Sequence, residues 1–148
     1  MYHFFNRFLL SVALLATSLS CQAVDAVYND SGLAIAGYDP VAYFTEQRPV
    51  WGNSKYTHQW QGVTWQFDSE TNKRLFATNP EKYAPQYGGY CAYAAAKGAI
   101  ASGDPNSWSI IDNKLYLNYS PAIKQRWSNN INGYTSRADA NWPKLIKQ

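Results

Sequence analysis

The stretch that decides the fold is KYTHQWQGVTWQF, residues 55–67. Aromatic and apolar side chains alternate with polar ones on both sides of Gln61-Gly62, and this period of two is typical of half-buried strands. A two-residue loop with glycine joins antiparallel strands in a tight hairpin. The spacing therefore predicts a hairpin with six larger side chains on one face. The expected cross-strand pairs are Trp60 with Val63, His58 with Trp65, and Tyr56 with Phe67.

The segments after this hairpin predict short helices and a second hairpin. Asp68 or Ser69 is placed to cap a helix that runs to about Thr78, with Leu75 and Phe76 as its buried residues. The further expected elements are a helical turn at 80–83, a short helix at 90–98, a hairpin of strands 108–112 and 114–118, a helix from Ser120-Pro121 with the packing stripe Ile123, Trp127 and Ile131, and a last helical segment that Pro143 breaks. Residues 24–50 are expected to form an irregular leader. Two hairpins with three or four short helices make a small α+β domain.

The composition limits the class of protein. The chain has 148 residues, a formal net charge of +3 and 46% apolar residues. This length fits one domain, and the apolar content with a small net charge argues against disorder. The charge is too weak and dispersed for a nucleic-acid-binding face, and two cysteines are too few for a disulfide scaffold.

Residues 1–23 read as an export signal. A basic residue precedes the apolar run 8–16, which is too short to cross a membrane as a helix. Small side chains at Cys21 and Ala23 fit cleavage by signal peptidase. We expect cleavage to leave a periplasmic or secreted domain of residues 24–148 without a transmembrane segment. The alternative is a lipoprotein acylated at Cys21.

Cleavage leaves one cysteine and one histidine, and both are candidate metal ligands. Cys91 follows Gly88-Gly89 at the expected start of a helix, where free N–H groups and the helix dipole favour a thiolate. The alternative for Cys91 is a small buried side chain. His58 supplies an imidazole, although a histidine on an aromatic face is more often a core residue. Nitrogen and sulfur suit copper or zinc, but two ligands fall short of the four of a structural zinc site.

Other chemistry has weaker support in the sequence. A Cys–His nucleophile pair would use Cys91, but no flanking motif or third orienting residue accompanies it. The chain has no His-Glu-x-x-His, P-loop or Gly-x-Ser-x-Gly motif. Asp39, in the stretch GYDP, is interpreted as a turn-former, with a ligand or acid/base role as the alternative. Gly88-Gly89 is interpreted as a tight turn, with anion binding as the alternative. These patterns lean against an enzyme.

Four stretches carry a family resemblance. They are GYDPVAYF at 37–44, NPEKYAPQYGGYCA at 79–92, KLYLNY at 114–119 and ADANWP at 138–143. Together they resemble exported, stand-alone bacterial proteins of the YHS domain family. The resemblance implies a strand–turn–strand–helix core at about residues 56–93. It also implies metal handling, because YHS domains occur beside heavy-metal transporting ATPases and are related to cysteine-rich metal-sensing domains. This chain keeps only Cys91 of the cysteine-rich pattern.

Three functional hypotheses follow from these residues. The leading one is an exported YHS-domain protein that binds a soft transition-metal ion, copper or zinc, in the periplasm through Cys91 and His58. The second is a non-catalytic interaction module that binds a protein partner or a small ligand through aromatic surface. The third is a thiol-dependent redox protein that uses Cys91. The sequence assigns four of its tryptophans to the core: Trp60, Trp65, Trp108 and Trp127.

Overall fold

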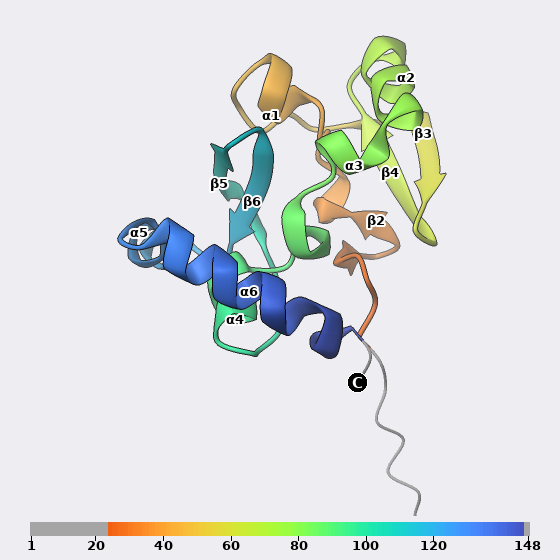
Figure 1. Ribbon diagram of the computed structural model, residues 1–148. Helices are drawn as coiled ribbons and strands as arrows, with labels where there is room; N and C mark the ends of the chain where they lie inside the picture. Colours follow the sequence, from red (N-terminus) through yellow and green to blue (C-terminus); the bar gives the residue numbers. More distant parts are fainter. Residues whose placement is uncertain (1–23, 147–148) are drawn as a thin grey trace, which may run out of the picture.

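The computed structural model describes residues 24–146 (Figure 1). The predicted export signal and its alternative, acylation at Cys21, lie outside these residues. Within them, every helix is too short or too polar to cross a membrane.

The hairpin predicted around Gln61-Gly62 forms from β3 (Asn53–Trp60) and β4 (Val63–Phe67). Both pairs nearest the turn are confirmed. They are Trp60 with Val63 and His58 with Trp65. The local alternation of side chains was therefore sufficient to place this part of the register.

The third predicted pair is wrong. Phe67 pairs with Asn53 instead of Tyr56, because the register of the two strands shifts before Thr57. The start of β3 is held by another part of the chain, where the Gly52 N–H donates to the Gly37 carbonyl at 2.9 Å. This contact is not local in sequence, so the alternation of side chains in residues 55–67 could not predict it.

The expectation of an irregular leader at residues 24–50 is also wrong. This segment contains β1 (Asn29–Asp30), β2 (Leu33–Ala34), the 3-10 turn η1 (Ile35–Gly37) and α1 (Ala42–Thr45). β2 pairs in parallel with β4, which gives a sheet of order β1-β2-β4-β3. Strands this short carry almost no periodic signal, and their pairing depends on a partner far along the chain.

The helix after the hairpin forms as predicted. α2 (Glu70–Thr78) begins at its N-cap Ser69, whose hydroxyl accepts the Asn72 N–H at 3.1 Å. Phe76 is fully buried, but Leu75 is 38% exposed, so the expectation that both are buried is wrong for Leu75. Adjacent residues point about 100° apart on a helix, and α2 meets the sheet with one face only.

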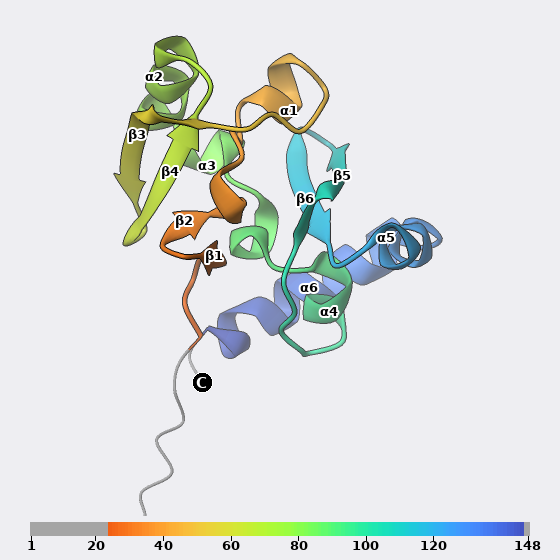
Figure 2. The ribbon, with the colours of Figure 1, turned by 180° about the vertical axis from the view of Figure 1, so that it is seen from behind.

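The second half of the chain supplies the other predicted hairpin and the remaining helices (Figure 2). These elements are α3 (Pro80–Tyr83), η2 (Gln86–Gly89), α4 (Ala92–Ala96), β5 (Asp104–Ile111), β6 (Lys114–Asn118), α5 (Pro121–Ser128) and α6 (Ile131–Leu145). β5 and β6 form a separate two-stranded sheet. The α+β class and both hairpins are confirmed.

The prediction that Pro143 breaks the last helix is wrong. It lies inside α6, which continues to Leu145. Proline removes only one N–H from the last turn, and packing on either side maintains the helix. Leu145 is 5% exposed, and the Asn141 amide donates to the Ala95 carbonyl of α4 at 3.0 Å.

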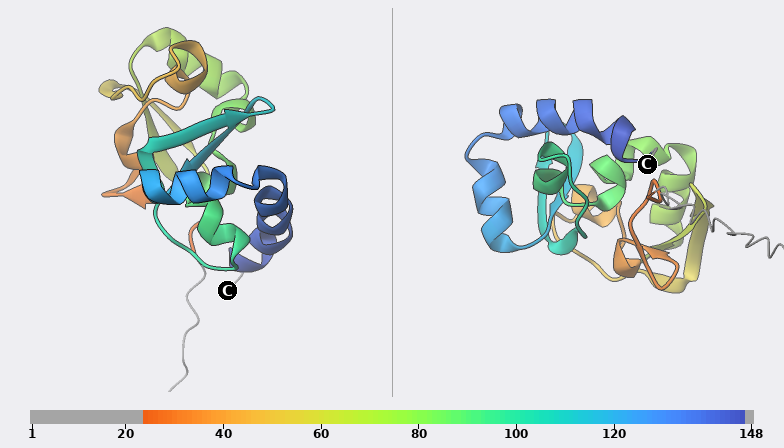
Figure 3. Two further views of the ribbon diagram at one scale, coloured as in Figure 1. Left: turned by 90° about the vertical axis from the view of Figure 1, so that its left-hand side faces the viewer. Right: turned by 90° about the horizontal axis from the view of Figure 1, so that it is seen from below.

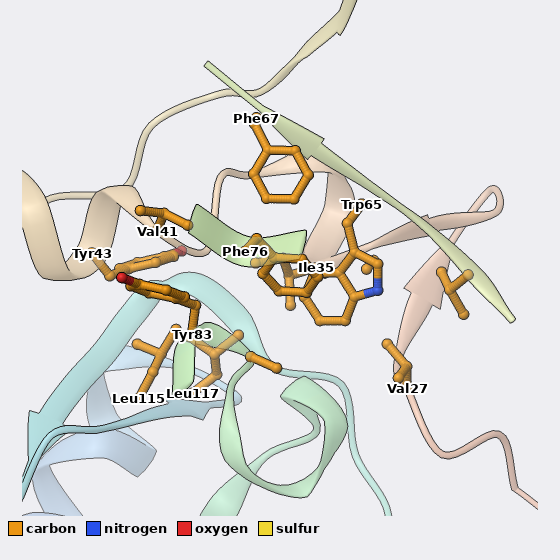
Figure 4. Close-up of a cluster of buried hydrophobic side chains, with 13 residues drawn as sticks. Val27, Ile35, Val41, Tyr43, Trp65, Phe67, Phe76, Tyr83, Leu115 and Leu117 are labelled. Carbon is orange, nitrogen blue, oxygen red and sulfur yellow. The ribbon is translucent and has the colours of Figure 1, made fainter. Parts of the chain in front are cut away.

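The two sheets share one hydrophobic core (Figure 4). Side chains converge on it from the N-terminal segment, β4, α2, α3 and β6. They include Ile35, Val41, Tyr43, Trp65, Phe67, Phe76, Tyr83, Leu115 and Leu117. A second cluster lies under α6 around Trp127, Tyr116 and Ala138. Trp65 and Trp127 are therefore core residues as predicted, whereas Trp60 and Trp108 are only partly buried and pack against the core.

Candidate functional site

Cys91 is the N-cap of α4. Its Sγ accepts the Ala94 N–H at 3.5 Å, and its thiol donates to Asn118 Oδ1 at 3.7 Å. The side chain is 1% exposed, yet it lines an apolar cavity of about 240 Å³ together with Tyr93 and Tyr119. The prediction that Cys91 lies within the first turn is thus off by one position, because the helix begins at Ala92.

Asn118 is the nearest polar side chain to the thiol, and it is fully buried. Its Oδ1 also accepts the Tyr93 N–H at 3.1 Å. Its Nδ2 has no hydrogen-bond partner among the described residues. An amide N–H group is a donor and offers no lone pair to a metal ion. Asn118 therefore orients the Cys91 thiol through its Oδ1, which accepts both the thiol and the Tyr93 N–H.

His58 lies in different surroundings from Cys91. It is half-buried on β3, and its ring meets Phe76 edge to face with centroids 6.1 Å apart. β3 and α4 are drawn at opposite ends of the fold in Figures 1 and 2. Within residues 24–146, no group of three His, Cys, Asp or Glu side chains is arranged to hold a metal ion. These residues alone do not fit a closed Cys/His metal centre.

Asp39 is a fully buried carboxylate. One oxygen accepts the N–H groups of Val41 and Ala42 at 2.8 and 3.2 Å, and the other accepts the Asp68 N–H at 2.9 Å and the Asn72 side-chain amide at 2.7 Å. Burial raises the pKa of the Asp39 carboxyl, and these four hydrogen bonds oppose the rise. Its predicted turn-forming role extends to joining α1 to the start of α2.

A groove runs between the β3–β4 turn and the C-terminal half of α6. Two adjoining cavities of about 340 and 280 Å³ share four lining residues: Trp60, Ala84, Pro85 and Trp142. We call the combined space the α6 groove. In Figure 3 the C-terminal end of α6 lies beside the N-terminal strand and the segment around η2. Tertiary packing therefore builds this groove from segments that are far apart in sequence.

The two ends of the α6 groove differ in polarity. The end beside the N-terminal segment is largely apolar, with Val27, Trp65 and Ile146 in its wall. The end beside α3 is polar, and its polar side chains are Glu81, Gln86 and Asp139. The groove thus combines aromatic surface with a few polar groups, which is the usual make-up of a small-molecule site.

Tyr87 holds Asp139 at the polar end. The buried Tyr87 hydroxyl donates to Asp139 Oδ1 at 2.8 Å. Burial and this hydrogen bond both raise the pKa of Tyr87, so the phenol remains a donor at neutral pH. Its ring also packs on Trp142, with centroids 5.9 Å apart. These contacts fix two groove residues of α6 against η2.

Gly88 allows the N-terminal segment to cross η2 beside the groove. A Cβ on Gly88 would lie 1.9 Å from the Ala26 carbonyl oxygen, and the backbone at Gly88 has a φ of 61°. The Tyr28 N–H donates to the Gly88 carbonyl at 2.9 Å. The glycine is therefore required for close backbone packing, which accounts for one half of the Gly88-Gly89 pair without an anion.

Residues 41–87 match the family model of the YHS domain. The chain contains a YHS domain. Comparison with curated proteins and with solved structures finds no match.

The YHS domain supplies one wall of the α6 groove. Trp60, Ala84, Pro85 and Tyr87 fall within the matched residues, whereas Asp139 and Trp142 belong to α6. Cys91 also lies outside the matched stretch, and His58 lies inside it. The groove is therefore formed where α6 packs against the YHS domain.

The sequence reasoning did not select the groove residues. It assigned Trp60 to the core, and it named Trp142 only within the stretch ADANWP. One signal was present, since Asp139 and Trp142 are three residues apart on a helix and so share a face. The partner wall depends on tertiary packing, which no local pattern reveals.

Proposed function

We propose that this protein is an exported, non-catalytic binding protein whose α6 groove holds a small ligand. The observation that carries the proposal is the pair of adjoining cavities that share Trp60 and Trp142. The larger cavity, of about 340 Å³, is in the range of small-ligand pockets, which begins near 300 Å³, and the adjoining cavity of about 280 Å³ extends it. The export part rests on residues 1–23 of the sequence.

The side chains of the groove suit binding. Trp60 from β3 and Trp142 from α6 supply indole rings to the lining, while Gln86 and the two carboxylates offer hydrogen-bond partners at one end. Aromatic rings bury a large area at little cost in side-chain entropy, and a few polar groups then orient the ligand. This arrangement favours the second sequence hypothesis, an aromatic binding module.

A neutral aromatic probe tests the groove. In ¹⁵N-labelled protein titrated with 2-phenylethanol, the indole N–H resonances of Trp60 and Trp142 are expected to shift to saturation. The Trp51 resonance is the internal control, because Trp51 is 63% exposed and stacks on Tyr38 outside the groove. Trp142→Ala is expected to weaken binding roughly tenfold, by about 1.4 kcal/mol, through loss of one aromatic wall.

Two further variants make the titration decisive. Trp142→Phe retains an aromatic ring and is expected to restore most of the affinity, whereas Trp51→Ala leaves it unchanged. Thermal unfolding of each variant confirms that the fold persists. Shifts confined to Trp51, or equal affinities for wild type and Trp142→Ala, would show that the groove is not the site.

A second proposal keeps a soft metal ion, copper or zinc, as the ligand of Cys91, and treats His58 as a separate candidate. Its support is the YHS domain together with the cavity of about 240 Å³ that Cys91 lines, through which an ion would reach the thiol. Thiolate sulfur prefers such ions. Residues 24–146 group no three His, Cys, Asp or Glu side chains. Further donors to an ion at Cys91 would therefore be groups of another kind or would come from outside these residues.

Metal analysis tests this second proposal. Protein purified without a histidine tag is expected to bind Cu(I), and Cys91→Ser is expected to lose more than about tenfold in affinity, since even an outer-shell change costs 10–100-fold. Serine is a good N-cap, so this variant removes the sulfur while keeping a cap on the Ala94 N–H. Equal, weak Cu(I) and Zn(II) titrations of wild type, Cys91→Ser and His58→Ala would exclude metal binding at these residues.

A further inference from the structure

We propose that the α6 groove selects a small organic cation with an apolar body, such as an aryl-alkyl ammonium. The inference rests on the proposed function and adds the chemical class of the ligand. It follows from charge complementarity within the groove, from the placement of two indole rings and from the way one carboxylate is held.

The charged side chains that line the groove are both acidic. They are Glu81 and Asp139, and neither cavity has a lysine, arginine or histidine among its lining residues. The whole chain carries a formal net charge of +3, so this local excess of negative charge runs against the average of the protein. A ligand with a positive group would balance it, whereas an anion would be repelled.

The nearest lysine in sequence does not cancel this charge within the groove. Lys82 follows Glu81, but its Nζ lies over the Tyr83 ring, 5.1 Å from the centroid. Tyr83 is not among the groove residues. The acidic end therefore remains available to a cation.

The aromatic walls favour a cation for a second reason. The faces of indole rings attract ammonium and guanidinium groups, and tryptophan is the strongest aromatic partner for them. Trp60 comes from β3 and Trp142 from α6, so both rings are set by regular structure. The adjoining apolar end, with Val27, Trp65 and Ile146, then receives the uncharged body of the ligand.

Asp139 is oriented before any ligand arrives. Tyr87 donates to its Oδ1, and the remaining oxygen has no hydrogen bond from the described residues. Because the Tyr87 hydroxyl is buried and its ring packs on Trp142, the carboxylate and the indole are held by the same side chain. A preorganised carboxylate loses less entropy on pairing with a cation.

A series of three probes of similar shape tests the inference. Phenethylammonium, 2-phenylethanol and phenylacetate differ chiefly in charge, and their affinities for the purified protein are measured by calorimetry at low salt. Phenethylammonium is expected to bind about tenfold more tightly than 2-phenylethanol, and phenylacetate more weakly than either.

Conservative variants assign this preference to the carboxylates. Asp139→Asn and Glu81→Gln, alone and together, are expected to reduce the ratio of the affinity for phenethylammonium to the affinity for 2-phenylethanol to less than about threefold. Glu70→Gln is the matched control, because it removes an equal charge from α2, outside the groove. It is expected to leave the whole series as in the wild type.

The outcomes separate the two levels of the proposal. If 2-phenylethanol shifts the Trp60 and Trp142 resonances but phenethylammonium binds no more tightly, the cation inference is overturned and the binding groove stands. If none of the three probes shifts those resonances, the proposed function fails, and the inference fails with it. A cation preference that persists unchanged in the double variant would also overturn the assignment to Glu81 and Asp139.

Discussion

Replacing Asp39 with alanine is expected to cost about 4 kcal/mol of unfolding free energy. Four N–H groups, from Val41, Ala42, Asp68 and Asn72, would lose their common acceptor in a region that excludes water. A buried donor left without a partner costs about 1–3 kcal/mol. Because a small domain has about 5–15 kcal/mol in total, Asp39→Ala is expected to bring the protein close to its unfolding threshold. Urea unfolding followed by tryptophan fluorescence measures the loss.

Asp68→Ala is the matched control for this prediction. Asp68 is exposed, and its interaction with Asp39 is made by its backbone N–H, which alanine retains. Its expected cost is below about 1 kcal/mol. Equal stabilities of Asp39→Ala and wild type would show that the buried carboxylate does not hold α1 and α2 together.

Phe76→Ala is expected to cost about 3–5 kcal/mol through the cavity that it leaves. The Phe76 ring is fully buried and meets the rings of Trp60, Trp65 and Phe67 with centroids 4.9–5.8 Å apart. Its loss removes these ring contacts between α2 and the sheet. It also loosens Trp60, so the affinity of the α6 groove for 2-phenylethanol is expected to fall as well.

Leu75→Ala serves as the control for Phe76→Ala. Leu75 lies on the same helix, but it is 38% exposed, and its replacement is expected to cost less than about 1 kcal/mol. Both variants place an alanine at neighbouring positions of α2, so the helix propensity of the new residue is the same. The difference between their unfolding free energies therefore reports the burial of the side chain that was removed. If the two unfolding free energies agree, the packing of α2 is not as the structure describes.

The YHS domain forms only part of the α6 groove. Asp139 and Trp142 lie outside the matched residues 41–87, on a helix that packs against the YHS domain. A YHS domain alone would present Trp60 without the opposite wall. The chemistry of the groove therefore belongs to this combination of domain and helix.

Much of the local structure could be predicted from particular residues. Ser69 and Ser120 accept backbone N–H groups at the starts of α2 and α5, as their short polar side chains indicate. Gln61-Gly62 placed the β3–β4 turn, and the pattern at 108–118 placed the second hairpin. These signals act within a few residues, so a single sequence contains them in full.

The candidate site was less accessible to the same reasoning. His58 and Cys91 were grouped because they are the only histidine and cysteine after residue 23, yet one packs on Phe76 and the other caps α4. Composition gives the number of residues of each type but not their positions in the fold. Trp60 is predicted as a core residue, since an aromatic side chain at a core wall and one at a groove wall follow the same periodic pattern.

The sequence by itself determined the α+β class, the two hairpins, the helix caps and the YHS resemblance, because each depends on local backbone preferences or on short motifs. Tertiary structure alone decided the parallel pairing of β2 with β4, the hydrogen bonds from Asp68 and Asn72 to Asp39, and the placement of Trp60 and Trp142 along one groove. Each of these joins segments separated by many residues, and their closeness results from the burial of a common core. A periodic pattern predicts which side chains are buried in that core, but it does not predict which of them are in contact there.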